Sequence, residues 1–339
     1  MDSLNPVPQI PVVDVAALVD ADSSAADRAE VGRSLDVACR TSGFLLVGGH
    51  GIERRLRDDL EVQFREFFAL PDDEKSRIAM PRGGTAWRGW FPVGGELTSG
   101  VPDRKEGVYF GTELGRDDPR VRAGTPLHGA NLFPERPEAL RATVLRWIDE
   151  VESLGQALLR GLALGLGVEE DWFARHLTAD PTVLFRAFHY PPGDGDEWGV
   201  GEHTDYGLIT LLAQDHHGGL QVRADGEWVD VPADPYVFVV NIGDMLDRMT
   251  RGRYRSDPHR VRNLSGQDRV SFPLFLDPSW DARVTPLPDE VFAGEAAPAD
   301  DADERWDGAS VHEWDGAYGD YLTAKVARVF PDLFAEVAP

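Results

Sequence analysis

Cysteine and long apolar runs are both scarce in this sequence. Cys39 is the only cysteine among the 339 residues, so no internal disulfide and no cysteine-based metal site can form. We expect this thiol to lie in the core, on the same helical face as Leu35. No run approaches the roughly 18 consecutive apolar residues of a membrane-spanning helix, and the first residues do not resemble a secretory signal. We therefore expect a cytoplasmic protein without a membrane partner.

Positive charge is also in short supply. Lys and Arg number 34 against 59 Asp and Glu, which gives a formal net charge of −25 at pH 7. A field of this sign repels phosphate backbones, so we expect no nucleic-acid partner. A small anionic ligand is still compatible with this composition, because a buried arginine sets its own local potential. No heptad repeat or apolar stripe indicates an obligatory protein partner, so a small molecule is the expected partner.

The first half of the chain is predicted to be mostly helical. Apolar residues at helical spacing predict helices at 25–41, 53–68, 138–164 and 169–177. Short strands at 10–14 and 43–47 precede the first two long helices, and the Gly- and Trp-rich segment 83–100 is predicted to be an ordered loop with short strands.

From residue 183 onward the pattern changes to that of short strands separated by Gly, Pro and Asp turns. The predicted strands are 183–190, 208–213, 219–223, 228–232, 236–241, 259–263 and 269–276. This number of closely spaced short strands is typical of a sandwich or jelly roll. An acidic surface loop at 290–307 and a helix at 318–330 follow. We predict one domain, with a helix-rich part at about 1–180, a β-core at about 181–285 and a C-terminal loop and helix at about 286–339.

A histidine and an aspartate stand two residues apart, at His203 and Asp205. On an extended strand such residues point to the same side, so both can reach one metal ion. Among the nine histidines, His259 is the best third ligand because it opens a predicted strand after a turn. Two histidines and a carboxylate form a facial triad with open metal positions, typical of non-haem iron oxygenases. The other histidines considered lie in predicted turns or near a helix end: His50, His176, His216 and His217.

Ten residues after His259, the strand period puts Arg269 and Ser271 on one side of a predicted strand. A guanidinium beside a hydroxyl is well suited to bind a carboxylate, because the planar fork forms paired, charge-assisted hydrogen bonds.

Taken together, these motifs and others along the chain carry a resemblance to a known family. The sequence resembles, over nearly its full length, the isopenicillin N synthase-like family of iron(II)/2-oxoglutarate-dependent oxygenases. The most specific matching motifs are His203-Thr204-Asp205-Tyr206-Gly207, Asn241-Ile242-Gly243-Asp244, Ser256-Asp257-Pro258-His259-Arg260-Val261 and Arg269-Val270-Ser271-Phe272. Shorter matches include Ile10-Pro11-Val12-Val13-Asp14, His50-Gly51-Ile52, Arg88-Gly89-Trp90, Asp103-Arg104-Lys105-Glu106 and Tyr190-Pro191-Pro192.

The resemblance implies a mainly β fold with flanking helices, built on a double-stranded β-helix, or jelly roll. It implies that Fe(II) is bound by His203, Asp205 and His259, and that 2-oxoglutarate and dioxygen are the co-substrates. It further implies that 2-oxoglutarate is bound by Arg269 and Ser271 with Tyr190, and that Asn241 lies in the cofactor site beside the metal. The expected reaction is oxidation of a small molecule, most simply hydroxylation, with release of succinate and carbon dioxide.

Substrate residues are predicted from segments expected to flank the mouth of the barrel. They are Arg88, Trp90, Tyr109, Phe188 and Phe275. A buried Arg88 would select an acidic substrate. At two positions the sequence differs from many relatives: Trp90 replaces a Tyr, and His189 replaces an aromatic residue before Tyr190. Both positions lie in segments expected to line the substrate pocket, so the differences concern substrate identity.

Three alternatives remain at this point. The first is an iron oxidase of the same fold that uses no 2-oxoglutarate. The second is a zinc hydrolase on the same three ligands, for which Glu202 is the only nearby general base, although on a strand it points away from His203. The third is a binding module without turnover.

Overall fold

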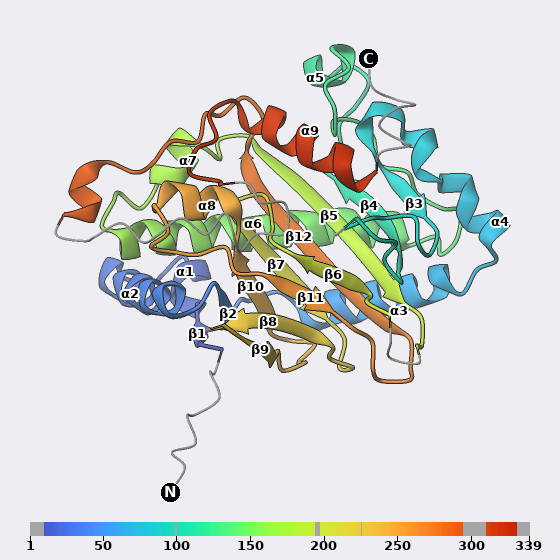
Figure 1. Cartoon of the computed structure of the whole chain (residues 1–339), viewed down its shortest axis with the longest axis horizontal. Helices are drawn as coiled ribbons and strands as arrows, with labels where there is room; N and C mark the ends of the chain where they lie inside the picture. Colours follow the sequence, from blue (N-terminus) through green and yellow to red (C-terminus); the bar gives the residue numbers. More distant parts are fainter. Residues whose placement is uncertain (1–9, 99, 194–196, 225, 294–309, 331–339) are drawn as a thin grey trace, which may run out of the picture.

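The described chain forms two β-sheets (Figure 1). Residues of both sheets line one cavity. The computed structural model describes residues 10–98, 100–193, 197–224, 226–293 and 310–330. The larger sheet has the order β1 (Val12–Asp14), β2 (Phe44–Gly48), β10 (Phe238–Ile242), β7 (Ile209–Gln214), β12 (Arg269–Ser279), β5 (Pro181–Tyr190), β4 (Glu106–Gly111) and β3 (Gly89–Phe91). The smaller sheet has the order β6 (Val200–His203), β11 (His259–Val261), β8 (Leu220–Ala224) and β9 (Glu227–Asp230). Neighbouring strands are antiparallel except β1 and β2, and the predicted jelly-roll core with flanking helices is confirmed.

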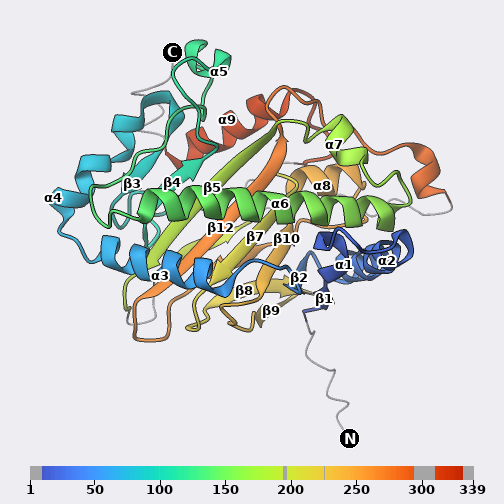
Figure 2. The same cartoon turned by 180° about the vertical axis from the view of Figure 1, so that it is seen from behind.

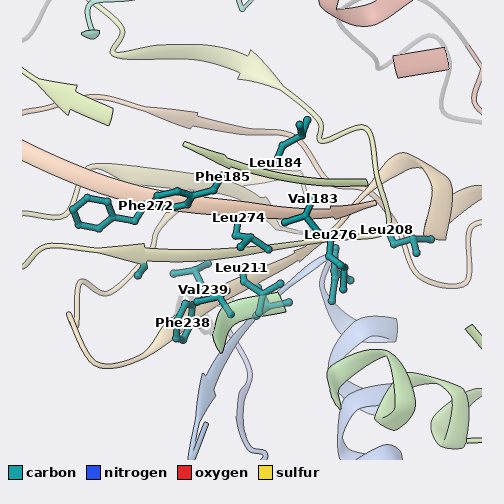
Figure 3. Packing of buried hydrophobic residues seen from close by; sticks show 14 of the residues in the cluster. Val183, Leu184, Phe185, Leu208, Leu211, Phe238, Val239, Phe272, Leu274 and Leu276 are labelled. Carbon is teal, nitrogen blue, oxygen red and sulfur yellow. The ribbon is translucent and has the colours of Figure 1, made fainter. Parts of the chain in front are cut away.

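Side chains along β12 alternate between the cavity and the helical side of the sheet. Arg269 and Ser271 line the cavity, as strand geometry requires for residues two apart. The residues between and after them belong to the hydrophobic core on the other face: Val270, Phe272, Leu274 and Leu276. Figure 3 shows part of this packing, where Leu274 lies beside Leu211 of the neighbouring strand β7. One strand therefore contributes both to the core and to the cavity wall.

Helices cover the outer face of the larger sheet. The described residues form, on this face and elsewhere, the helices α1 (Ala16–Val19), α2 (Ala25–Thr41), α3 (Arg54–Phe68), α4 (Asp72–Lys75), α5 (Pro119–Arg122), α6 (Leu140–Leu166), α7 (Trp172–His176), α8 (Asp244–Met249) and α9 (Tyr318–Val329). Short 3-10 helices span Ser76–Ile78, Met80–Ala86 and Asp289–Phe292. Figure 2 shows α6 and α3 running across the back of the sheet. A Cβ atom at Gly155 of α6 would come within 2.7 Å of Leu276 Cδ2, so this glycine permits the close approach of helix and sheet.

Helix α2 has the bounds expected from its sequence. Ser24 caps its first turn: the side chain accepts from the Asp27 backbone N–H at 3.2 Å, and the Asp27 carboxylate accepts from Ser24 N in return. Cys39 is buried as expected, and burial raises the pKa of its thiol. Within the described ranges, none of the helices combines the length and the apolar character needed to cross a membrane.

Helix α9 lies on the opposite side of the larger sheet from α6, in front of β5 and β4 in Figure 1. Two tyrosines attach it to the core. Tyr318 donates to Asp277 Oδ2 at 2.5 Å, and Tyr321 donates to Asp244 Oδ2 at 2.8 Å. Several residues of α9 and its end line the cavity: Leu322, Val326, Val329 and Phe330. This helix therefore forms part of the cavity wall.

The sequence-based expectation did not include several short or fully buried elements, among them α1, α4, α5, β4, β6 and α8. Strand β4 is buried at every position, so it lacks the polar alternation that identifies a half-exposed strand. Strand β6 has only four residues and α8 only six, too few for a clear periodicity. Residues 294–307 of the predicted acidic loop lie outside the described residues.

Candidate active site

The two strand histidines meet across the smaller sheet. His203 ends β6 and His259 begins β11, and the two are directly paired in the antiparallel register. Their ring centroids are 4.1 Å apart. Asp205 Oδ1 lies 3.9 Å from Nε2 of each histidine, and one potential ligand atom from each of the three residues lies within 4.8 Å of the others. The structure thus brings together the three residues predicted as metal ligands.

Asp205 does not lie on the same strand as His203, contrary to the prediction from sequence. Strand β6 ends at His203, and Asp205 lies beyond the strand, next to a bend. The backbone N–H of Asp244 donates to the carbonyl of Asp205 at 2.8 Å and holds this segment against α8. Asp205 therefore reaches the histidines through a tertiary contact, not through continuous strand geometry.

The second carboxylate oxygen of Asp205 is fully engaged by the larger sheet. Oδ2 accepts from Thr210 Oγ1 at 2.5 Å and from Asn241 Nδ2 at 2.8 Å. Thr210 and Asn241 are paired residues of β7 and β10. Burial disfavours the charged carboxylate, but His259, His203 and these hydrogen bonds outweigh it and hold the pKa of Asp205 below its usual range. Oδ1 is consequently the oxygen directed to the histidines.

Both histidines are in a form that suits metal binding. His203 Nδ1 lies 2.8 Å from the carbonyl of Gly201, so Nδ1 carries the proton and the Nε2 lone pair is available. Burial lowers the pKa of His203, and burial together with His203 lowers that of His259 to about 4. Neutral imidazoles beside a carboxylate are the donor set of a mononuclear iron site, so the three residues fit Fe(II).

An arginine site for a carboxylate lies in the same cavity. Arg269 is fully buried, and its Nε donates to the Gly218 carbonyl at 2.5 Å while Nη2 donates to Gln214 Oε1 at 3.2 Å. Its Nη1 is buried and has no partner among the described residues. Ser271 Oγ donates to Tyr190 Oη at 3.4 Å, and the guanidinium lies 4.7 Å from the Tyr190 ring centroid. The free nitrogen and two hydroxyl groups fit a carboxylate of 2-oxoglutarate.

Two of the five predicted substrate residues line the cavity, namely Phe188 and Phe275. Arg88 instead donates to the Leu127 carbonyl at 2.8 Å, and burial lowers its pKa to about 10. Trp90 donates to Glu106 Oε2 at 2.8 Å, and Tyr109 donates to Glu96. Within the described part of the chain, these three are not among the residues that line the cavity, because the side chains of Arg88, just before β3, and of Trp90 and Tyr109, in β3 and β4, are directed toward these other partners.

His189 is likewise directed away from the cavity. Its Nδ1 lies 2.8 Å from Glu106 Oε1 and its Nε2 lies 2.7 Å from Asp268 Oδ1. Its ring stacks on Phe68 of α3, with centroids 5.2 Å apart. Since neighbours on a strand face opposite sides, Tyr190 faces the cavity and His189 faces the helices. Glu202, the base that a zinc hydrolase would need, is also not one of the described cavity-lining residues.

Several cavity residues were not found by sequence reasoning. The polar ones are Glu96, Thr98, Lys105, Arg186, Thr210 and Asp277. For two of them, the sequence spacing could have predicted a position in the cavity. Arg186 stands four residues before Tyr190, and Asp277 stands six residues after Ser271, so the period of two puts both on the cavity side. For the others, only the tertiary fold reveals the location.

The comparisons with known proteins agree with this geometry. Residues 10–136 match the family described as non-haem dioxygenase in morphine synthesis N-terminal, and residues 181–278 match the 2OG-Fe(II) oxygenase superfamily. A Dictyostelium discoideum protein named "Probable iron/ascorbate oxidoreductase" is 43% identical, with 96% of each chain covered. The chain belongs to the 2OG-Fe(II) oxygenase superfamily. As a member of this superfamily, the protein is an oxygenase that uses Fe(II), 2-oxoglutarate and dioxygen.

Two further similarities extend over most of this oxygenase. A 1-aminocyclopropane-1-carboxylate oxidase of Dictyostelium mucoroides is 34% identical, with 96% of each chain covered. A full-length Neurospora crassa protein, whose crystal structure was determined in complex with alpha-KG, is 25% identical and has a TM-score of 0.76. That similarity covers 94% of this chain and 96% of the other. The resemblance stated from sequence motifs is therefore confirmed at the level of family and fold.

Proposed function

We propose that this oxygenase hydroxylates a small organic molecule at an Fe(II) ion held by His203, Asp205 and His259. One observation carries the proposal. The three ligand atoms gather in the same cavity that contains the unpartnered Nη1 of Arg269. A metal site and a carboxylate site in one cavity match the two functional groups of 2-oxoglutarate, its 2-oxo acid and its distal carboxylate. Two imidazoles and one carboxylate also leave metal positions open for this co-substrate and for dioxygen.

The cavity residues have separate roles in this proposal. Arg269 and Ser271, with Tyr190, bind the distal carboxylate of 2-oxoglutarate. Asn241 acts through Asp205, because its side-chain amide donates to the Asp205 oxygen that faces away from the histidines. Bound Fe(II) would supply the activation of dioxygen, which is the oxidant. Two of the four electrons would come from 2-oxoglutarate, released as succinate and carbon dioxide, and two from the substrate. The apolar wall of the cavity excludes water from the reacting groups.

Substrate-dependent succinate release tests this proposal. Protein loaded anaerobically with Fe(II) and 2-oxoglutarate is mixed with oxygen and a set of small organic molecules, and succinate and oxidised products are quantified together. We expect one succinate for each oxidised product. His203→Ala should abolish both products, whereas His176→Ala should not, because His176 is exposed on α7 and its ring stacks on Trp172, away from the cavity.

Oxygen uptake and ligand binding, measured on the same samples, identify outcomes that would contradict the proposal. Oxygen consumption and product formation without succinate would identify an iron oxidase that does not use 2-oxoglutarate. Binding of small molecules without consumption of oxygen would identify a module without turnover. Full activity of the His203→Ala variant would contradict the assignment of the triad.

A further inference from the structure

Arg186 is a mostly buried cation, with 16% of its side chain exposed, and it has no hydrogen bond to another described residue. It lies on β5, and its side chain lines the cavity. Its Nε is buried without a partner, and no hydrogen bond joins any of its nitrogens to another described residue. The guanidinium carbon lies 4.1 Å from the centroid of the Tyr109 ring and 4.6 Å from that of Phe275. Two aromatic rings therefore hold a charged, five-donor group against the cavity without satisfying its donors.

The nearest carboxylate is already occupied by other groups. Glu96 Oε1 lies 3.7 Å from Arg186 Nη1, beyond hydrogen-bonding distance. This oxygen accepts from the hydroxyl of Tyr109 instead, and Glu96 Oε2 lies 2.9 Å from Lys105 Nζ. Lys105 in turn contacts Asp103 at 2.6 Å. These groups form a closed ion-pair network beside Arg186, and the guanidinium is left to bind a group that enters the cavity.

The backbone positions of Arg186 and Arg269 are well separated along the larger sheet. Arg269 is directly opposite Tyr190 in the register of β12 and β5. Arg186 precedes Tyr190 by four residues on the same strand, which corresponds to roughly 13 Å at about 3.3 Å per residue. The cavity therefore contains two separate arginine sites, of which Arg269 serves the co-substrate in the proposed function.

The remaining cavity wall around Arg186 is mostly apolar. Phe188 and Phe275 come from the larger sheet, and the residues from α9 and its end are aliphatic or aromatic: Leu322, Val326, Val329 and Phe330. A ligand that places a charged oxygen group at Arg186 would lay its hydrocarbon part along this wall.

Asp277 also lines the cavity and has an atom without a hydrogen-bond partner among the described residues. Its Oδ2 accepts from Tyr318, but its Oδ1 is buried without a partner in the described structure. Burial raises the pKa of Asp277 to about 7. Near neutral pH a large share of this carboxyl is therefore uncharged and does not repel an anion bound at Arg186.

We propose that Arg186 binds a carboxylate of the substrate, so that the substrates of this enzyme are small organic acids with an apolar body. A planar guanidinium fork matches a carboxylate with two parallel, charge-assisted hydrogen bonds, which a neutral ester cannot form. The inference rests on the proposed function, because it assigns the substrate end of the same cavity.

Binding of matched acid and ester pairs tests this assignment. The probes are small aryl- and alkyl-alkanoic acids, each paired with its methyl ester, added anaerobically to enzyme loaded with Fe(II) and 2-oxoglutarate. Dissociation constants are measured by calorimetry. We expect acids to bind at least about 10-fold more tightly than their esters, and Arg186→Gln to abolish this preference. Arg55→Gln is the matched control, because Arg55 is an exposed arginine on α3.

The affinity for 2-oxoglutarate separates a failure of this inference from a failure of the proposed function. The affinity for 2-oxoglutarate is measured by anaerobic titration, from the visible absorption of the complex between Fe(II) and the 2-oxo acid. Arg186→Gln should leave it unchanged within about twofold, whereas Arg269→Gln should weaken it. Arg186→Met is a second variant with an apolar side chain of similar length, which keeps the test available if Arg186→Gln folds poorly.

Three results would overturn the inference: no acid of the set binds, esters bind as tightly as their acids, or both Arg186 variants keep the preference for acids. Normal binding of 2-oxoglutarate in any of these cases would leave the proposed function intact.

Discussion

At the scale of single residues, Thr210 and Asn241 decide which oxygen of Asp205 faces the histidines. Both donate to Oδ2, and Oδ1 is the atom near His203 and His259. Groups that orient metal ligands in this way commonly change metal affinity or activity by about 10–100-fold when they are removed.

We predict that Thr210→Val weakens Fe(II) binding by about 10–100-fold. The substitution keeps the shape of the side chain and removes the hydroxyl, so Asp205 Oδ2 loses its 2.5 Å hydrogen bond. Thr210→Ser keeps the donor and should stay within a few-fold of wild type. Anaerobic titration with Fe(II) measures both variants. Equal affinities for the valine and serine variants would show that the hydroxyl does not orient the ligand.

Asp277 should make the stability of the metal-free protein depend on pH. Burial raises its pKa to about 7 in the folded state, whereas an unfolded aspartate titrates near 3.9. The folded state therefore favours the protonated form, and this stabilising contribution is complete below pH ~4 and is lost as the pH rises toward ~7. A difference of about three pKa units between the folded and unfolded states corresponds to a loss on the order of 4 kcal/mol in the free energy of unfolding.

We predict that Asp277→Asn removes this part of the pH dependence. The asparagine oxygen can still accept from Tyr318, so the variant should lose less stability than wild type between pH ~4 and ~7. Urea unfolding at several pH values, in the presence of a chelator, gives the difference between the two proteins. Parallel stability curves for wild type and variant would contradict the prediction.

At the scale of secondary-structure elements, α2 and α6 approach so closely that their backbones nearly touch. A Cβ atom at Gly165 of α6 would lie 2.5 Å from the carbonyl oxygen of Gly32 in α2. A backbone atom cannot rotate away as a side chain can, so a side chain here requires the helices to separate.

We predict that Gly165→Ala lowers the free energy of unfolding by about 1–3 kcal/mol. Alanine is the better helix former by about 1 kcal/mol, so a loss would show that the helix contact outweighs local propensity. Ser153→Ala, at an exposed position of the same helix, is the control and should change stability by no more than about 0.5 kcal/mol. Urea denaturation followed by circular dichroism measures both. An unchanged or higher stability of Gly165→Ala would mean that the two helices can move apart freely.

At the scale of the whole molecule, the proposed metal site joins the two sheets. His203 and His259 belong to the smaller sheet, while Asp205 is hydrogen-bonded to Thr210 and Asn241 of the larger one. The larger sheet also combines strands from both halves of the chain, since β2 pairs with β10. This pairing supports our proposal that residues 1–339 form one oxygenase domain.

We predict that Fe(II) and 2-oxoglutarate together raise the melting temperature of the wild-type protein. Ligands at about 100 times their dissociation constant stabilise the folded state by about 2.7 kcal/mol, which corresponds to about 4–6 °C for a chain of this size. Anaerobic calorimetry in the presence and absence of the ligands measures the shift. His203→Ala should lose most of it, and an undiminished shift in that variant would place the metal elsewhere.

The sequence by itself determined the parts of the protein that depend on short-range order. The period of two along 269–276 put Arg269 and Ser271 on one face, and the apolar spacing along 25–41 predicted a helix with its observed bounds. The family was identified from motifs for the same reason, because residues such as those around His203 and His259 are contiguous in the chain.

Only the tertiary structure decided the position of Asp205 beyond the end of β6, the roles of Thr210 and Asn241, and the separation of Arg88 and Trp90 from the cavity. These features depend on which strands are neighbours in the sheet and on which side chains lie within hydrogen-bonding distance of one another. Such long-range pairings leave no local period in the sequence. The unused donors of Arg186 are of the same kind, because a residue's lack of partners becomes visible only after all its neighbours are in place.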